Sequence, residues 1–266
     1  MSWLMLYRKE LRLTRTKFMI NIGFLLALVA ILWVLIERYN PAFIALIVPV
    51  VLVHLFYLFF AMLDSLRQEW KQKTTVFWLN IPTSGWQLLT AKFVAATTQL
   101  VVSLSLTLLF LYILLQRSIN HFIDSTIANF ILEQYQSYWW ILFFGILIAS
   151  LQAGGVVTFI YMMAKSIRRW GWLVGIAIVI AGSWLWVKFQ ETVVYRSVTE
   201  WGALLSEKNI METLSFHFDS FKNDPNIHME VTNNAVLYVG TAVVDVLIVV
   251  IILYASAWLL DHKVEA

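Results

Sequence analysis

The sequence predicts an all-α polytopic membrane protein with six transmembrane helices, because it is too apolar for a soluble domain. Hydrophobic residues make up 61% of the 266 residues and charged residues only 13%, with a mean hydropathy of +0.76. Soluble domains average about 45–50% apolar and about 25% charged residues. Apolar runs long enough to cross about 30 Å of hydrocarbon lie at residues 18–36, 43–62, 93–115, 139–164, 172–189 and 237–260. These runs are continuously apolar rather than alternating, which favours helices over barrel strands.

The distribution of Lys and Arg predicts the orientation of these spans. With the N-terminus inside, the cytoplasmic pieces carry most of the 19 basic residues, as the positive-inside rule requires. The exterior carries Arg38, Arg117, Lys188, Arg196, Lys208 and Lys222. We therefore expect a multi-pass protein of the bacterial cytoplasmic (plasma) membrane with both termini in the cytoplasm.

Segments outside the six runs complete one transmembrane domain, residues 1–266. Residues 1–17 mix apolar and basic side chains, which is typical of a helix lying in the membrane interface. Residues 116–138 have apolar residues at helical spacing and predict an amphipathic segment on the outer surface. Residues 190–235 are acidic and predict a small helical external cap between spans five and six, with one apolar face formed by Ile210, Leu214, Phe218 and Phe221.

Several classes of function are excluded by what the sequence lacks. Cysteine is absent, so disulfides, zinc–thiolate sites, Fe–S clusters and thiol nucleophiles are impossible. No phosphate-binding loop of the Walker type occurs, and the five histidines show no metal-ligand spacing. The basic isoelectric point near 9.0 fits a membrane flank better than a nucleic-acid partner.

The longest polar interruption assigned to the cytoplasm is residues 64–92. Glu69 and Lys73 are four apart in the order that favours a surface ion pair. Phe77 and Trp78 then form a compact apolar group before Pro82. Exposed aromatic residues at this position predict either a soluble partner that covers them or burial in the lipid headgroups.

The end of this loop predicts the start of the third span. Ser84 and Gln87 have the spacing of a capping box, which begins a helix. Trp86 and Lys92 are then expected at the level of the lipid headgroups.

The order of these parts resembles the six-span permease subunit of ABC exporters of the second permease type. The resemblance covers nearly the whole chain and includes KEL at residues 9–11, LNIPTS at 79–84 and LL at 88–89 before Lys92. It implies a permease that dimerises with a second copy or a close relative. It also implies that 64–92 is a coupling loop, where a separate ATPase subunit docks. The contacts implied for that ATPase are Glu69, Trp70, Lys73, Phe77, Trp78 and Pro82. The external insertion 190–235 is longer than the short hairpin expected of many members.

Polar residues inside the spans are the other candidates for function. Asp245 lies deep in the last run, where a carboxylate is costly and by default suggests function. It is either a protonated group bonded to Thr241 or a neighbouring helix, or a functional group with His54 as its partner. Pro49 is expected to kink the second span. The full set, as a cargo path or as inter-helix polar contacts, is His54, Gln99, Ser103, Thr107, Thr241 and Asp245.

Small residues predict where helices pack closely. On the fourth span they are Gly145, Ala149 and Ala153, and on the fifth Gly171 and Gly175.

The function expected from these features is the membrane subunit of an ATP-driven exporter that works by alternating access. The chain itself is expected to be no enzyme and to bind no cofactor, with ATP and Mg on the partner ATPase. Its 13 Trp and 18 Phe suit an amphipathic or hydrophobic cargo such as a peptide, lipid or antibiotic, with peptide export preferred. Two alternatives remain: a membrane enzyme acting on lipid through Asp245 and His54, and a non-transporting sensor whose external cap binds a ligand.

Overall fold

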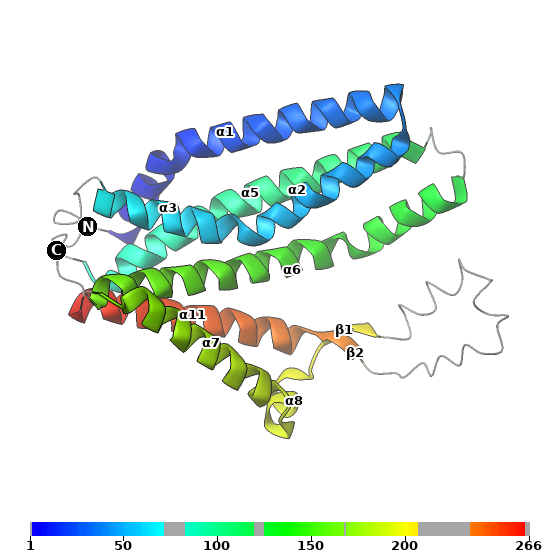
Figure 1. Ribbon diagram of the computed structural model, residues 1–266. Coiled ribbons are helices and arrows are strands. Elements are labelled where there is room, and N and C mark those ends of the chain that lie inside the picture. The colour runs from blue at the N-terminus through cyan, green and yellow to red at the C-terminus, as the bar shows by residue number, and fades with distance from the viewer. Residues whose placement is uncertain (1, 72–82, 120–124, 168, 207–234, 264–266) are drawn as a thin grey trace. The chain divides into compact units, whose positions relative to one another are not determined.

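The computed structural model describes residues 2–71, 83–119, 125–167, 169–206 and 235–263 (Figure 1). Within these ranges six helical segments are long and apolar enough to cross a membrane, which confirms the predicted all-α polytopic fold. They are α1 (Trp3–Arg38), the segment Pro41–Lys71, α5 (Gly85–Ile119), α6 (Ser125–Ser166), α7 (Gly171–Gln190) and α11 (Val239–His262). The chain divides into two compact units, Met1–Val179 with Val249–Ala266, and Ile180–Ile248.

The first helix is continuous from the basic N-terminal segment into the first span. α1 has 36 residues, so it is about 54 Å long at 1.5 Å per residue. The expected interfacial helix is therefore helical but forms the first turns of α1 rather than a separate element. Leu6 and Glu10 are buried on one side of it, while Arg8 and Arg12 are exposed.

The second span is built from four pieces rather than one regular helix. They are a 3₁₀ segment η1 (Pro41–Leu46), α2 (Ile47–Val53), a second 3₁₀ turn η2 (His54–Phe56) and α3 (Tyr57–Lys71). Pro49 lies in the first turn of α2, directly after the 3₁₀ segment η1. The irregular turn instead follows at His54–Phe56, and the Leu58 N–H donates to the Ser150 hydroxyl of α6 at 3.1 Å.

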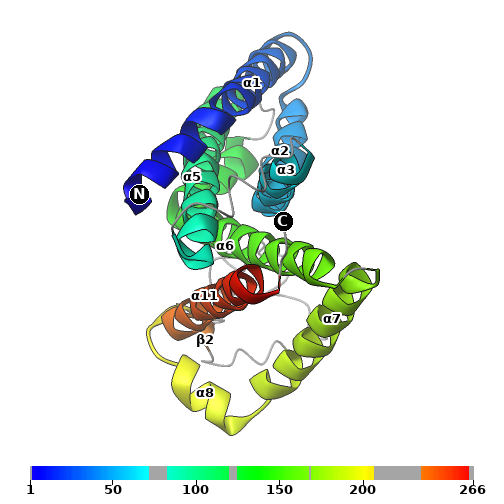
Figure 2. The ribbon, with the colours of Figure 1, turned by 90° about the vertical axis from the view of Figure 1, so that its left-hand side faces the viewer.

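Helix α5 is the centre of the first unit. It packs against α1, α3 and α6, and Leu89, Leu100 and Leu104 on it are fully buried. Figure 2 views these helices from the end at which α1 begins and α11 ends.

The close helix contacts fall partly on other glycines than the predicted ones. A Cβ at Gly154 would lie 2.8 Å from the Cβ of Leu58, whereas nothing lies within 4 Å of one at Gly145. The stripe predicted on the fourth span is therefore corrected to the face that carries Gly154. Gly175 behaves as expected, since a Cβ there would lie 3.1 Å from Met163.

The outer segment 116–138 is not a separate surface helix. Its described residues belong to the end of α5, which stops at Ile119, and to the start of α6, which runs unbroken from Ser125 through the fourth span. The apolar spacing that suggested a surface helix is therefore the beginning of a 42-residue helix.

The second unit contains a strand pair that the sequence did not suggest. After α8 (Val193–Thr199), β1 (Ala203–Ser206) pairs with β2 (Ala235–Tyr238) in an antiparallel ladder. Gly202 makes the turn before β1 with a φ of 67°. The described part of the external cap is therefore mixed rather than helical, and the expected apolar face of Ile210, Leu214, Phe218 and Phe221 lies outside the described residues.

Candidate functional site

The predicted coupling loop is described at its two ends. Lys73, Phe77, Trp78 and Pro82 lie outside the described residues. Glu69 and Trp70 lie in the last turn of α3, which ends at Lys71, and Ser84 precedes the first residue of α5. The candidate site is therefore the base of the loop, where the chain leaves and re-enters the helical unit.

A buried ion cluster occupies this base. The Lys92 ammonium donates to Glu10 Oε2 at 2.9 Å, to Glu69 Oε1 at 2.9 Å and to Ser65 Oγ at 3.3 Å. Because an ammonium has three N–H donors, these bonds match its full donor capacity. The exposed fractions of the Lys92, Glu10 and Glu69 side chains are 1%, 6% and 9%. The cluster therefore joins α1, α3 and α5 away from water.

Lys92 is buried against two carboxylates, so its ammonium is bonded within the protein rather than exposed to headgroups. The Glu69 carboxylate is buried against Lys92 as well. Its contact with a docking partner stays a prediction. Removing one member of such a cluster would leave a buried charge uncompensated, which typically costs about 3–5 kcal/mol. Lys92 thus holds α1 and α3 against α5 at the loop base.

Trp70 connects the same base to α6. Its ring meets the ring of Tyr161 edge to face, with centroids 5.3 Å apart. The Lys165 ammonium lies 5.4 Å from the Trp70 centroid and 5.6 Å from that of Tyr161, within the range of cation–π attraction. Trp70, one residue before the end of α3, is therefore half-buried against a fourth helix.

The loop exit is held by α11. Asp261 Oδ1 accepts a hydrogen bond of 2.7 Å from the Gly85 N–H, one of the amides that lack a partner within a helix at its N-terminus. A Cβ at Gly85 would lie 2.7 Å from that oxygen and 3.0 Å from the Ala257 carbonyl oxygen, so a larger residue would displace the Asp261 carboxylate. Trp86 also contacts Tyr254 of α11, with ring centroids 6.1 Å apart.

The predicted capping at Ser84 is present in part. The Gln87 N–H donates to Ser84 O at 2.9 Å and lies 3.4 Å from Ser84 Oγ.

The polar residues of the second and third spans form inter-helix contacts. His54 Nδ1 lies 2.8 Å from Val50 O, and His54 Nε2 lies 3.1 Å from Ser103 Oγ. Since a carbonyl only accepts, the network places the proton on Nδ1, and Ser103 donates to Nε2. The Asn21 amide of α1 in turn donates to Ser103 Oγ at 3.3 Å. Both ring nitrogens of His54 are thus engaged within the first unit, and the described residues that they contact there are Val50, Ser103 and Thr107.

The remaining candidates divide between the two units. Gln99 donates to Thr14 Oγ1 of α1, and Thr107 donates to Ser103 O at 2.9 Å. Thr107 Oγ1 also lies 3.4 Å from His54 Nε2 of the second span. Both side chains are buried, and both contact a neighbouring span rather than line an open path. Thr241 and Asp245 are half-buried in the first turns of α11, within the second unit.

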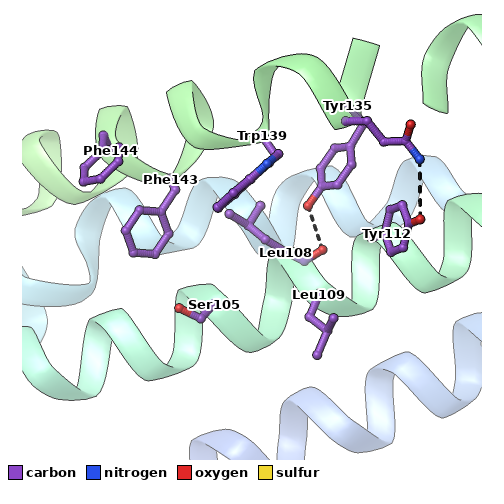
Figure 3. Close-up of a pocket in the computed structure, with 9 residues that line it drawn as sticks. Ser105, Leu108, Leu109, Tyr112, Tyr135, Trp139, Phe143 and Phe144 are labelled. Carbon is purple, nitrogen blue, oxygen red and sulfur yellow. Dashed lines mark hydrogen bonds between the residues drawn. The ribbon is translucent and has the colours of Figure 1, made fainter. Parts of the chain in front are cut away.

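An aromatic groove lies between α5 and α6 (Figure 3). Its volume is about 720 Å³. Trp139, Phe143 and Phe144 line its α6 side, and Leu108 and Leu109 line its α5 side.

Polar groups gather at one end of this groove. Tyr135 donates to Leu108 O at 2.7 Å, and the Gln136 amide lies 3.4 Å from the Tyr112 hydroxyl (Figure 3). The groove could therefore hold a molecule with an apolar body and an uncharged polar end.

Sequence reasoning missed Glu10, Asp261 and Asn21. Each is a polar residue in a segment whose role was predicted from the composition of the whole segment, not from single residues. Glu10 is the one carboxylate in the basic segment 1–17, and a lone acid among bases is a usable signal for a buried partner. No comparable signal marks Asp261 or Asn21.

No protein-family model, curated protein or solved structure matches this chain. The six apolar helices establish a multi-pass membrane protein. A more specific function has to be argued from the geometry of the loop base.

Proposed function

We propose that this chain is the membrane-spanning subunit of an ATP-driven exporter, energised by a separate ATPase that docks on the loop 72–82. ATP and Mg would be bound by that partner, and a second permease copy would complete the transporter. The observation that carries the proposal is the anchoring of the loop base. Lys92 of α5 pairs with Glu10 of α1 and with Glu69 of α3. Trp70 contacts Tyr161 of α6, and the Gly85 N–H donates to Asp261 of α11.

Such a base suits the transmission of force. A partner that displaces the loop would move the ends of α1, α3 and α5 together, because the ion cluster fixes them to one another. Binding can drive this change only if the partner has different affinities for the two states of the permease. The nucleotide cycle of an ATPase would supply that difference.

The aromatic groove supports the expected class of cargo. Trp139 and Phe144 leave about half of their surface exposed, at 47% and 53%, next to the hydrogen-bonding groups of Tyr112 and Gln136. An amphipathic peptide, lipid or antibiotic would place its apolar part on these rings.

Co-purification tests the docking. The chain is solubilised from native membranes, and the bound fraction is assayed for ATP hydrolysis. We expect an ATPase to co-purify, and Phe77→Ser with Trp78→Ser to remove most of it. The matched control is Trp170→Ser, which changes a 59% exposed tryptophan. Trp170 lies in the connection between α6 and α7, which is predicted to be on the same side of the membrane as the loop. If the double variant retains the full ATPase activity, or the control loses as much, the proposal is wrong.

A further inference from the structure

A polar pocket lies between α1 and α3, separate from the loop base and from the aromatic groove. It is lined by Lys17, Asp64, Arg67, Gln68 and Lys71 and has a volume of about 560 Å³. Lys17 forms an ion pair with Asp64, and its ammonium lies 3.5 Å from Gln68 Oε1. The side chains of Lys17 and Asp64 are each 56% exposed, so the pocket is open to the surroundings.

The pocket carries excess positive charge. Lys17, Arg67 and Lys71 face one carboxylate, that of Asp64, which already pairs with Lys17. Among the described residues no ion pair neutralises Arg67 or Lys71. The adjoining residues 72–82 contain no Asp or Glu, so the sequence offers no acid there either.

The position of the pocket along the helices matches the lipid phosphate level. Lys17 directly precedes the apolar stretch of α1, and Asp64 follows the apolar stretch of the second span. Arg67, Gln68 and Lys71 lie three, four and seven residues beyond Asp64, and this spacing places all four on one face of α3. The charges thus begin on both helices where the hydrocarbon layer ends.

We infer that this pocket binds the phosphate headgroup of an anionic phospholipid. Arg67 can pair with phosphate oxygens through two parallel N–H bonds, Lys71 adds a point charge, and the Gln68 amide can donate. Basic pockets between transmembrane helices are known to bind the headgroups of anionic lipids. The acyl chains of the bound lipid would lie along the exposed apolar surface beyond Lys17. The inference does not depend on the proposed partner ATPase.

The test measures lipid retention by the purified full chain. Native mass spectrometry compares phosphatidylglycerol with phosphatidylcholine of the same acyl chains. We expect a clear preference for phosphatidylglycerol. Replacing Arg67→Gln and Lys71→Gln together should lower its affinity about 30-fold, since each basic residue near an anionic surface contributes a factor of about five.

Two further variants separate a specific pocket from a diffuse basic surface. Arg8→Gln with Arg12→Gln removes the same charge from exposed positions of α1 outside the pocket and should change the affinity less than about threefold. The swap Arg67→Lys with Lys71→Arg keeps the charge and should retain the preference, which shows that the positive charge at these two positions, rather than the exact side chain, is needed. Equal losses in the pocket and control variants would overturn the inference. So would equal binding of both lipids, or displacement of the lipid by millimolar inorganic phosphate.

Discussion

Helices α1 and α5 are joined by an ion pair near each end, and the two pairs differ in burial rather than in distance. Near the loop, Lys92 lies 2.9 Å from Glu10, with side chains 1% and 6% exposed. At the opposite end, Arg117 lies 2.6 Å from Glu37, with side chains 43% and 33% exposed. Arg117 also lies 5.6 Å from the Trp33 ring centroid. The same two helices therefore allow a buried ion pair to be compared with an exposed one.

The difference indicates which end of the helix pair is fixed. Exposed ion pairs contribute about 0–1 kcal/mol, because water screens them and long side chains lose entropy. Breaking a buried pair costs far more, since the remaining charge has no solvent. We therefore expect the ion pair to contribute more to the α1–α5 contact beside the loop than at the far end. At the far end the buried side chains of Leu32, Ile36 and Leu114 join the two helices instead.

The largest effect is expected for Lys92→Met. The substitution leaves Glu10 and Glu69 buried without their shared cation, which should lower the free energy of unfolding by about 3–5 kcal/mol. Denaturation of the purified chain in mixed micelles measures this. A loss below about 1 kcal/mol would show that the buried Lys92 pairs stabilise the protein no more than the exposed Arg117–Glu37 pair. The two ends of the helix pair would then not differ.

Replacing the whole cluster separates stability from coupling. Glu10→Gln and Glu69→Gln added to Lys92→Met remove the stranded charges, so much of the lost stability should return. If the loop base transmits force, this triple variant should still bind the ATPase of the proposed exporter but no longer change its rate of ATP hydrolysis. Normal coupling in the triple variant would show that the cluster is structural only.

An intermediate effect is expected for His54→Leu in the interior. It leaves the Ser103 hydroxyl and the Val50 carbonyl without their His54 contacts, which should cost about 1–3 kcal/mol. The same mixed-micelle denaturation measures it. A loss of unfolding free energy equal to that of Lys92→Met would show that burial alone, not charge, determines how large the loss is.

A smaller effect is expected for Asp261→Ala at the loop exit. It removes the acceptor of the Gly85 N–H, and the loss of a helix-capping side chain costs about 0.5–2 kcal/mol. Asp261→Asn keeps an acceptor oxygen and should recover most of this stability. The comparison fails if both variants are equally destabilised.

The smallest effect is expected for Arg117→Gln at the far end. With both partners exposed to solvent, the free energy of unfolding should fall by less than about 1 kcal/mol. High salt should weaken the wild-type pair in the same measurement and reduce the difference further. A cost near that of Lys92→Met would show that the two ends are held alike.

The spans could be predicted from the sequence, whereas the contacts of the candidate site could not. Runs of apolar residues follow directly from the thickness of a bilayer, and all six correspond to helical segments. The Lys92 cluster depends on Glu10, which is 82 residues away in the chain, and no local pattern reports such a pairing. The same holds for Gly85 and Asp261, which are 176 residues apart. The strand pair at Ala203–Ser206 escaped prediction because four-residue strands carry too little periodicity.

The separation of Glu10 and Lys92 along the chain also constrains how the protein is made. Glu10 and Glu69 leave the ribosome before Lys92 does. For part of synthesis the two carboxylates therefore lack the cation with which they pair in the folded protein. The first helix can reach its final packing only after the third span has been inserted. Nascent chains stopped after residue 84 should therefore retain a water-accessible α1 N-terminal segment and be degraded by membrane quality-control proteases.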